Sequence, residues 1–587
     1  MSAGCATAAM IDEPASLSPA NRRKAGGVFG GGDNRSTSGL SSSRGLIVLL
    51  ALFALLFIAR SAICAEWQWS VPMDKGRAFL WIPPNCRQLR AVVVGQNNMI
   101  EQGILEHPDF RKTLEDEGMG EVFIAPPFDF VFQFDQDAGE KFDDMMNRLA
   151  EVSGYSELKF APVVPLGHSA CASFPWNFAA WNPGRTLAVL SVHGDAPLTK
   201  LTGSGRPNPD WGNRTLDGVP GLMVMAEYEW GDNEHGVDRL TPAMDYKNAH
   251  PKTPLAMLAE PGEGHFNYSD QLVKFLAMFL RKAAEERMPE KMSMDQPPTL
   301  RPIDPTKGWL VQRWHLNQPR TIEPAPYTSY EGDPNEAFWA FDKQMAWAIQ
   351  NYMADQPGKQ PQLLSVTSED MPLAEGCGEP VTPKFIPDAD GVTFHLKTAF
   401  MAFVPANGNA ARWAYLPVGS PLGHATGGGP IVLHKIVGPA IQTDTNTFEF
   451  AMNRANSTAD RRNFDIWVWA SHPGDAKYKS MVQQAMIRVP QNTEGVEQHI
   501  TFPTIPDQKA ITKSLKLDAT SDAGTKVYYY VLEGPAEVDG NVLEFTPIPP
   551  RAKFPVKVTV VAWQCGRTVE PKLKSAEPVE RKFYLTK

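Results

Sequence analysis

The chain has 587 residues, which is too long for a single hydrophobic core and predicts three or four domains. Its hydrophobic content of 43% and charged content of 21% are those of an ordinary globular protein. The net charge is -10 and no basic patch dominates, so we do not expect nucleic acid as a partner.

An apolar run at 45–59 is the first feature along the chain. Arg44 precedes it, and a stretch that ends in small residues near Ala65 follows it. The run is shorter than the roughly 20 residues of a membrane span, and its flanks are typical of a secretory signal peptide. We interpret 1–65 as a signal peptide, with an N-terminal anchor as the alternative. The protein is therefore expected in the periplasm or outside the cell, and at a membrane only if this segment is uncleaved.

Between 66 and 290, apolar runs of strand length alternate with helical stretches. An amphipathic pattern at 271–282 closes the series with a helix. Strands that alternate with helices form a mostly parallel sheet covered by helices on both faces. We therefore predict an α/β domain over 66–290. The predicted strands include 91–94, 121–125, 187–192, 222–226 and 255–259.

The chain changes character after residue 290. Residues 291–334 are rich in proline and are interpreted as a linker. Short alternating segments over 335–504 predict a β-rich middle domain of the sandwich type. A helix is expected at the start of that domain, because Asp333 offers a cap, Pro334 a first-turn proline and Glu336 a capping-box partner.

A second all-β unit is predicted over 505–587. Its length and strand spacing are typical of an immunoglobulin-like β-sandwich. The pair Asp539-Gly540 marks a hairpin turn within it. The predicted fold class of the whole chain is thus α/β, followed by β-sandwich domains.

A serine stands at a tight turn directly after an apolar strand pattern. Ser169 has Gly167 two residues before it and Cys171 two residues after it. In a nucleophile elbow these flanking residues must be small, because strand and helix nearly touch there. The second glycine of the G-x-S-x-G pattern is a cysteine here, which is also small and buries well. The pattern favours Ser169 as a nucleophile.

A serine nucleophile needs a base, and the base needs an orienting acid. His265 follows the predicted strand at 255–259 and precedes the closing helix. Glu229 follows the strand at 222–226 and is the first candidate for the acid. Asp232 in the same stretch is the second candidate, and Asp195 after the strand at 187–192 is the third. A solvated loop is the alternative interpretation of these acidic residues.

The reaction would also need donors for the negative oxygen of the tetrahedral intermediate. The backbone N–H of Ala170 is one candidate, because it directly follows the serine. A second N–H is expected from the polar stretch after the strand at 91–94, where Gln96 and Asn97 stand.

Residues 66–290 resemble the α/β-hydrolase family, in particular secreted bacterial esterases of carbohydrate-linked esters. The resemblance rests on Gly-His-Ser-Ala-Cys around Ser169, on Glu-Tyr-Glu ending at Glu229 and on Gly-His-Phe around His265. This family carries nucleophile, acid and base in that chain order. The resemblance implies that Ser169 and His265 are catalytic and that Glu229 completes the triad.

The same resemblance implies the chemistry. Ser169 would attack an ester carbonyl with His265 as base, and water would release the acyl group from an acyl-enzyme. No metal or organic cofactor is expected, and the cysteines show no metal-ligand spacing. The substrate is expected to be a small-molecule or polysaccharide ester. Four tryptophans near the motifs could stack on sugars or aromatic acyl groups, or pack in the core: Trp176, Trp181, Trp211 and Trp230.

Two other functions fit the same residues. An exported serine peptidase on this fold would use an identical triad, although no propeller-type repeats are present in the chain. A non-catalytic protein on a hydrolase fold would bind a glycan or another protein, and the β-rich domains are candidates for glycan binding in either case.

Overall fold

The computed structural model describes residues 66–587 apart from 195, 200–205, 230–239, 373–379 and 457–462. The segment interpreted as a signal peptide or anchor, 1–65, lies outside the described residues, and so do Asp195, Trp230 and Asp232. Within the described part of the chain, no helix has the length and apolar character needed to cross a membrane.

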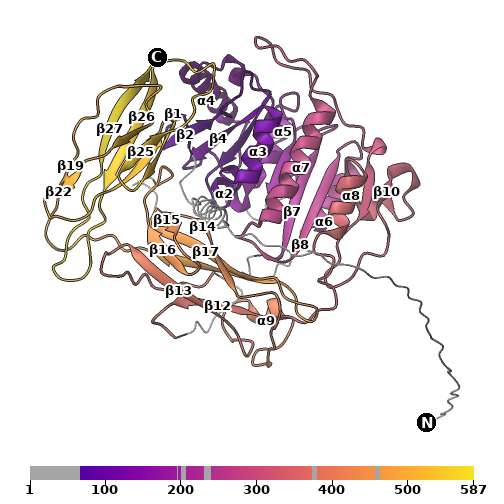
Figure 1. The fold of residues 1–587 in the computed structure, drawn as a ribbon. Helices are drawn as coiled ribbons and strands as arrows, with labels where there is room; N and C mark the ends of the chain where they lie inside the picture. The colour runs from indigo at the N-terminus through magenta and orange to yellow at the C-terminus, as the bar shows by residue number, and fades with distance from the viewer. Residues whose placement is uncertain (1–65, 195, 200–205, 230–239, 373–379, 457–462) are drawn as a thin grey trace, which may run out of the picture. The chain divides into compact units, whose positions relative to one another are not determined.

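The N-terminal half is built on an eight-stranded sheet in the order β1-β2-β4-β3-β5-β6-β7-β8 (Figure 1). The strands from β3 to β8 run parallel, whereas β1 and β2 form an antiparallel edge. This confirms the predicted mostly parallel sheet. The strands are β1 (Trp69–Pro72), β2 (Arg77–Trp81), β3 (Ala91–Gln96), β4 (Met119–Ala125), β5 (Val163–His168), β6 (Val189–Val192), β7 (Gly221–Tyr228) and β8 (Leu255–Gly264).

Helices cover both faces of this sheet, and alternate strand residues serve the two faces. Val92 shares a core with Phe142 of α4, whereas its neighbour Val93 shares a core with Phe110 of α3 and Leu276 of α7. Because both faces are buried, the parallel strands read as continuous apolar runs. The helices are α2 (Glu101–Leu105), α3 (Pro108–Glu117), α4 (Ala138–Ser153), α5 (Ser173–Trp181), α6 (Leu240–Ala249) and α7 (Asp270–Arg287).

The predicted linker, 291–334, is folded. It contains β9 (Trp309–Gln312) and β10 (Ala325–Pro326), which form a small antiparallel sheet with β11 (Ala337–Ala340). About half of the prolines that suggested a linker lie in the irregular stretch before β9, and most of the others lie between the strands.

The helix predicted to begin after Asp333 begins later, so its predicted start is wrong. Asp333 caps a single 3-10 turn, and β11 follows it. The helix is α8 (Lys343–Asn351), capped by Asp342, whose side chain accepts a hydrogen bond from Met345 N at 2.9 Å. Residues 337–340 form a strand and not a helix because Phe338 and its neighbour Trp339 are buried in different cores, as alternating strand residues are.

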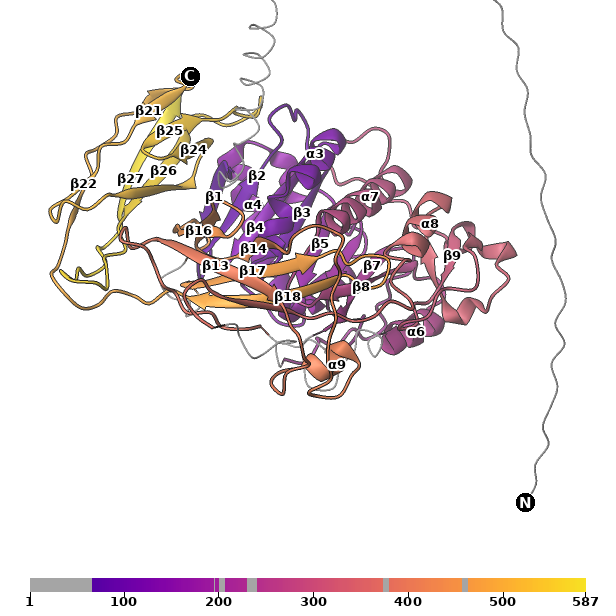
Figure 2. The same ribbon diagram turned by 60° about the horizontal axis from the view of Figure 1, so that its bottom comes forward.

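The middle region consists of two antiparallel sheets that enclose one core. The first has the order β12-β13-β16-β15 and the second the order β14-β17-β18 (Figure 2). Apolar residues from both sheets meet between them, which agrees with the predicted β-sandwich. The elements are β12 (Leu364–Ser368), β13 (Thr393–Phe400), α9 (Ala410–Ala414), β14 (Val432–Val437), β15 (Ala440–Gln442), β16 (Thr447–Phe450), β17 (Asp465–His472) and β18 (Met481–Arg488).

The last region is also all-β, with one sheet in the order β20-β27-β26-β23 and another in the order β21-β25-β24. The predicted hairpin lies between β24 and β25, but its two turn residues are Gly540, with φ +60°, and Asn541, because Asp539 still pairs with Val542 as the last residue of β24. The strands are β19 (Ile500–Thr501), β20 (Gln508–Lys509), β21 (Ser514–Lys516), β22 (Thr520–Ser521), β23 (Tyr528–Glu533), β24 (Ala536–Asp539), β25 (Val542–Phe545), β26 (Val556–Trp563) and β27 (Val579–Thr586).

These regions share cores across the predicted domain boundaries. Trp339 and Val482 belong to the core that covers one face of the parallel sheet, and Val558 packs in the same core as Trp69 of β1. The boundaries at 290, 334 and 504 therefore stay predictions.

Candidate active site

Ser169 directly follows β5 and has a positive φ of 51°, which is uncommon for a residue other than glycine. Such backbone conformations cost on the order of 1–3 kcal/mol and cluster at functional sites. The chain then makes a 3-10 turn, Ser169–Cys171, and enters α5. The Ser169 side chain is thereby held at the carboxyl end of the sheet, where the residue remains partly exposed.

The tight turn depends on two glycines. A Cβ on Gly167 would lie 2.1 Å from the carbonyl oxygen of Cys171, and a Cβ on Gly194 would lie 1.9 Å from the Cβ of Ala172. The small residue that the start of α5 requires is therefore Gly194, in the turn after β6. Cys171 itself is completely buried, so the missing glycine of the elbow pattern leaves the turn intact.

Ser169, His265 and Glu229 form a continuous hydrogen-bonded chain. The Nε2 atom of His265 lies 2.7 Å from the Ser169 Oγ, and its Nδ1 atom is hydrogen-bonded to Glu229 Oε2. Glu229 and His265 directly follow the neighbouring strands β7 and β8, whose register pairs Tyr228 with Gly264. The carboxyl ends of three parallel strands thus place the three side chains at one point.

The environment orients Glu229. The carboxylate is completely buried, and its Oε1 atom accepts a hydrogen bond from the backbone N–H of Ala226 at 3.0 Å. The backbone N–H of His265 donates to the Tyr228 carbonyl at 3.1 Å. Backbone contacts therefore fix both the acid and the histidine before any substrate binds.

The residues predicted for the oxyanion site differ in whether the structure leaves them available to a substrate oxygen. Ala170 lies beside Ser169 and is partly exposed. The N–H of Asn97 donates to the Ile124 carbonyl at 2.8 Å, so it is not available to a substrate oxygen. The reason is that the hydrogen bonds between β3 and β4 continue one residue past Gln96. The Gln96 side chain turns away and accepts hydrogen bonds from the backbone N–H groups of Phe128 and Asp129.

Glu101 ties the loop after β3 to the serine turn. One carboxylate oxygen accepts hydrogen bonds from the N–H groups of Asn98 and Met99, at 3.2 and 2.8 Å. The other accepts from the N–H of His168 at 2.9 Å. Burial raises the pKa of Glu101 to about 7. This buried glutamate is a site residue that the sequence patterns did not indicate.

Two more histidines contact the main chain of His265. His168 Nε2 lies 2.7 Å and His193 Nδ1 lies 3.0 Å from the His265 carbonyl oxygen, and both rings are completely buried. Because a carbonyl only accepts, both nitrogens carry hydrogen in this arrangement. The signal for His193 in the sequence is its place directly after the strand at 187–192.

His193 is in turn held by a carboxylate. Its Nε2 atom lies 2.7 Å from Glu260 Oε2, and the hydroxyl of Tyr352 donates to Glu260 Oε1 at 2.6 Å. Burial lowers the pKa of His193, but Glu260 beside it outweighs burial and the pKa is raised. Burial, with His265 and His193 nearby, holds the pKa of His168 well below its usual range. The environment therefore favours the neutral form of His168 and shifts His193 toward its charged form.

The middle β region reaches the acid. Arg412 Nη2 donates to the carbonyl oxygen of Glu229 at 2.9 Å, and the ring of Trp413 stacks on that of Tyr228 at 4.8 Å. Two residues before the acid, Glu227 forms an ion pair with Lys479 at 3.0 Å. Both charged side chains are buried, with 1% and 4% exposure.

The same region contacts the chain around His265. Phe266 packs against Trp467 at 5.0 Å, and Gln484 Nε2 donates to Asn267 Oδ1 at 3.2 Å. A Cβ on Gly264 would lie 2.1 Å from Gln484 Nε2, so a larger residue there would have to displace the Gln484 amide. Figure 2 shows β14, β17 and β18 in front of the parallel sheet. The middle region therefore supports the site directly.

The three described tryptophans near the motifs are buried or half-buried against other side chains. Trp176 and Trp211 are buried, and Trp211 Nε1 donates to Asn177 at 2.7 Å. Trp181 is half-buried against Phe142. The described residues contain no cluster of side chains suited to hold a metal ion.

Comparisons with known proteins give structural neighbours only. No protein-family model and no curated protein matches the chain. A phospholipase/carboxylesterase from Dyadobacter fermentans is 13% identical over 37% of this chain and 99% of its own, with a TM-score of 0.25. A truncated carbohydrate esterase from gut microbiota is 10% identical over 38% and 100%, with a TM-score of 0.28. Est1E from Butyrivibrio proteoclasticus is 14% identical over 38% and 100%, with a TM-score of 0.26.

The fold follows from the structure itself. Six parallel strands stand in the order β4-β3-β5-β6-β7-β8, with helices on both faces and an antiparallel edge. A serine elbow follows β5, and a glutamate and a histidine follow β7 and β8. The described residues between 66 and 290 therefore have the α/β-hydrolase fold.

Proposed function

We propose that this protein is a serine hydrolase that cleaves carboxylic esters, with Ser169 as nucleophile, His265 as base and Glu229 as the orienting acid. The observation that carries the proposal is the hydrogen-bonded chain from Ser169 Oγ through His265 to Glu229 at the carboxyl ends of β5, β7 and β8. Such a chain activates a serine that would otherwise be a weak nucleophile.

In the first half of the reaction, Ser169 Oγ attacks the ester carbonyl carbon and its proton passes to His265 Nε2. Glu229 stays ionised and stabilises the resulting imidazolium through Nδ1. The N–H of Ala170 is the donor proposed for the oxygen that becomes negative. The tetrahedral intermediate collapses, His265 Nε2 returns the proton to the departing alkoxide, and the alcohol leaves an acyl group on Ser169.

In the second half, water takes the place of the alcohol. His265 Nε2 accepts a proton from the water as its oxygen attacks the acyl carbon, and Ser169 Oγ leaves with that proton. The net reaction converts one ester and one water into an alcohol and a carboxylic acid. The partial exposure of Ser169 is the access that substrate and water require.

Within this class we propose an exported esterase of carbohydrate-linked acyl esters. The apolar run at 45–59 with its small-residue flank supports export. The resemblance of the three motifs to secreted bacterial esterases supports the substrate class. Binding of a glycan by the β-rich regions is a further part of this proposal.

The test is hydrolysis of an ester panel by the full chain beside Ser169→Ala. The panel contains p-nitrophenyl acetate, a feruloyl ester and an acetylated polysaccharide, together with a peptide p-nitroanilide. Ester cleavage that falls by about 10⁴-fold or more in the variant supports the proposal. Preferential cleavage of the anilide would instead identify a serine peptidase. A folded protein that cleaves nothing and resists a fluorophosphonate label would identify a non-catalytic binding protein.

A further inference from the structure

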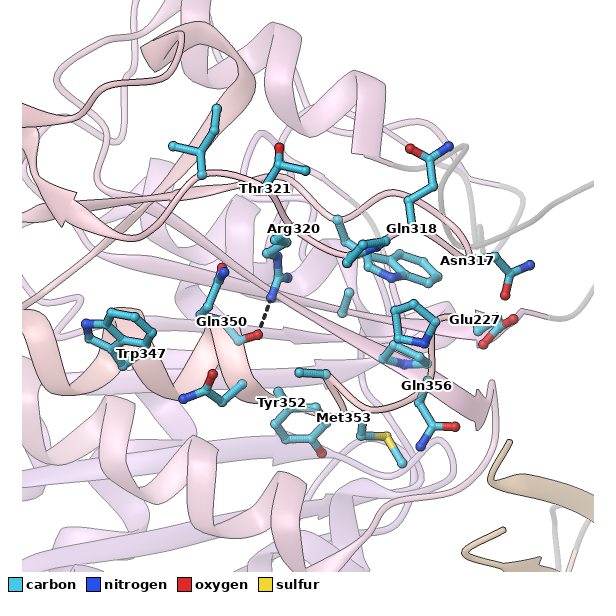
Figure 3. A pocket seen from close by; sticks show the side chains of 18 of the residues that line it. Glu227, Asn317, Gln318, Arg320, Thr321, Trp347, Gln350, Tyr352, Met353 and Gln356 are labelled. Carbon is cyan, nitrogen blue, oxygen red and sulfur yellow. Dashed lines mark hydrogen bonds between the residues drawn. The ribbon is translucent and has the colours of Figure 1, made fainter. Parts of the chain in front are cut away.

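A cavity with a volume of about 320 Å³ lies near the end of β7, where Glu227 lines it (Figure 3). It is lined by residues of the segment 314–323, by the second half of α8 and the residues after it, by Glu227 near the end of β7, by the middle of β8 and by Lys479. Neither Ser169 nor His265 is among the described residues that line it. Its volume is at the lower end of the range for sites that bind small molecules.

Arg320 has an unused hydrogen-bonding edge at this cavity. Its Nη1 atom donates to the carbonyl oxygens of Ile349 and Gln350, at 2.7 and 3.1 Å, which cap the carboxyl end of α8. Its Nε atom is buried and has no hydrogen-bond partner among the described residues, and within them Nη2 has no recorded partner either. Figure 3 shows the side chain near the centre of the residues that line the cavity.

No carboxylate of the described residues is in ion-pair contact with Arg320. Burial lowers the pKa of its guanidinium to about 10, so the group is still charged at neutral pH. Arg320 is only partly exposed and its Nε atom is buried, so a partner of opposite sign would offset the water that the guanidinium has lost. The two carbonyls at the end of α8 satisfy one edge of the group only.

Another arginine of this protein shows which group binds to the Nε and Nη2 donors of a guanidinium. Arg488 donates from Nε and Nη2 to the two carboxylate oxygens of Asp465, at 2.7 and 2.9 Å. These are the two atoms that Arg320 leaves without partners. A carboxylate matches this planar pair of donors better than a single-point anion does.

The other residues that line the cavity indicate the chemistry of the rest of the ligand. Trp347 and Tyr352 line the cavity, and the hydroxyl of Tyr352 is bound to Glu260, so the tyrosine offers its ring. Gln350 Oε1 is a buried acceptor without a partner among the described residues. Flat aromatic surfaces bind ring-shaped molecules, and the free acceptor suits a hydroxyl. At the far end, Glu227 and Lys479 neutralise one another.

We infer that this cavity binds a small carboxylic acid that carries a hydroxylated ring, with the carboxylate on the free edge of Arg320. Sugar acids and phenolic acids share this chemistry. The inference concerns a site separate from Ser169 and does not depend on hydrolysis.

The experiment is calorimetric titration of the full chain that carries Ser169→Ala, so that no turnover contributes heat. Sodium glucuronate and sodium ferulate are the two probes, and glucose and methyl ferulate are their matched controls without a carboxylate. One-site binding of either acid with a Kd below about 1 mM, and no binding of its control, supports the inference and shows which ring is preferred. Absence of binding of both acids at about 10 mM overturns it.

Substitutions test whether Arg320 and Gln350 bind the acid. Arg320→Lys keeps a cation but loses the planar fork, and is expected to weaken binding about tenfold or more. Gln350→Ala is expected to weaken it severalfold and leaves the backbone cap of α8 intact. Arg313→Gln is the control, because Arg313 directly precedes the segment 314–323, does not line the cavity and pairs with the exposed Glu336. Unchanged affinity in both Arg320→Lys and Gln350→Ala would place the acid elsewhere and overturn the assignment.

Discussion

His193 donates a hydrogen bond from Nδ1 to the main-chain carbonyl of His265 at 3.0 Å. His168 donates a second one to the same oxygen at 2.7 Å. The proposed base is thus held through its backbone as well as through its ring. Because its ring must reach Ser169 and Glu229 at once, small movements of this backbone would break the chain of hydrogen bonds.

We predict that His193 is a positioning residue. In His193→Phe the ring volume is kept but the donor is lost, and kcat is expected to fall about 10- to 100-fold with little change in KM. His193→Asn keeps an N–H donor near the place of Nδ1, so most of the activity is expected to return. Steady-state kinetics on p-nitrophenyl acetate measures both. A fully active His193→Phe would show that the carbonyl contact is dispensable.

We predict that Glu229→Gln lowers kcat by roughly 10²- to 10⁴-fold, because the amide cannot stabilise the imidazolium and can impose the wrong tautomer on His265. Glu323→Gln, at an exposed glutamate, is the control and should act like the parent. Asp232→Asn and Asp195→Asn address the two other candidate acids, which lie outside the described residues. Loss of activity in Asp232→Asn, with Glu229→Gln unaffected, would transfer the role of the acid to Asp232.

The buried ion pair between Glu227 and Lys479 joins the acid strand to the middle region. Lys479→Met would leave a buried carboxylate without its cation, which costs about 3–5 kcal/mol of unfolding free energy. Lys477→Met is the control, because Lys477 is exposed. Urea unfolding followed by tryptophan fluorescence measures both variants.

A second variant isolates the charge. Glu227→Gln combined with Lys479→Met is expected to be more stable than Lys479→Met alone, since no unpaired charge remains buried. If the double variant were the less stable of the two, the loss would come from packing and not from charge.

Burial raises the pKa of Glu263 to about 8, from an ordinary value of 4.5, and the neighbouring Glu260 adds to the shift. Between these values the folded protein binds a proton that the unfolded chain has released. The contribution of Glu263 to stability is therefore complete below about pH 4.5 and is lost as pH rises through about 8.

Glu263→Gln removes this titration. We expect the unfolding free energy of the variant to increase relative to that of the parent as the pH rises from about 5 to about 9. Urea unfolding of both proteins at several pH values measures this difference. A difference between the two proteins that is independent of pH would mean that Glu263 does not carry the proton.

Part of this architecture could be predicted from local patterns. The parallel strands are buried on both faces, so their apolar runs are visible in the sequence. The hairpin at Asp539-Gly540 is visible because its turn needs residues that tolerate positive φ. The start of α8 was predicted wrongly, since the local capping signal at Asp333 was overridden by the burial of β11 between two cores.

For the candidate site as well, some features could be predicted from the sequence and others could not. Ser169, Glu229 and His265 each follow a strand, which made them candidates, with Asp232 and Asp195 as alternative acids, and the structure brings these three together. Asn97 was predicted as an N–H donor because it lies in a polar loop, but the N–H completes a hydrogen bond to the neighbouring strand. Whether a backbone donor is free depends on strand pairing, which local sequence does not report.

By itself, the sequence determined the α/β character of 66–290, the serine turn and the order of the three candidate triad residues, because these depend on hydrophobic period and on residues near in the chain. Only the tertiary structure decided which groups meet across long separations. Tyr352 meets Glu260, Lys479 meets Glu227, and Arg320 has no carboxylate in ion-pair contact among the residues that the structure describes. Such pairings depend on how distant strands and helices pack, and packing follows from the burial of the whole chain.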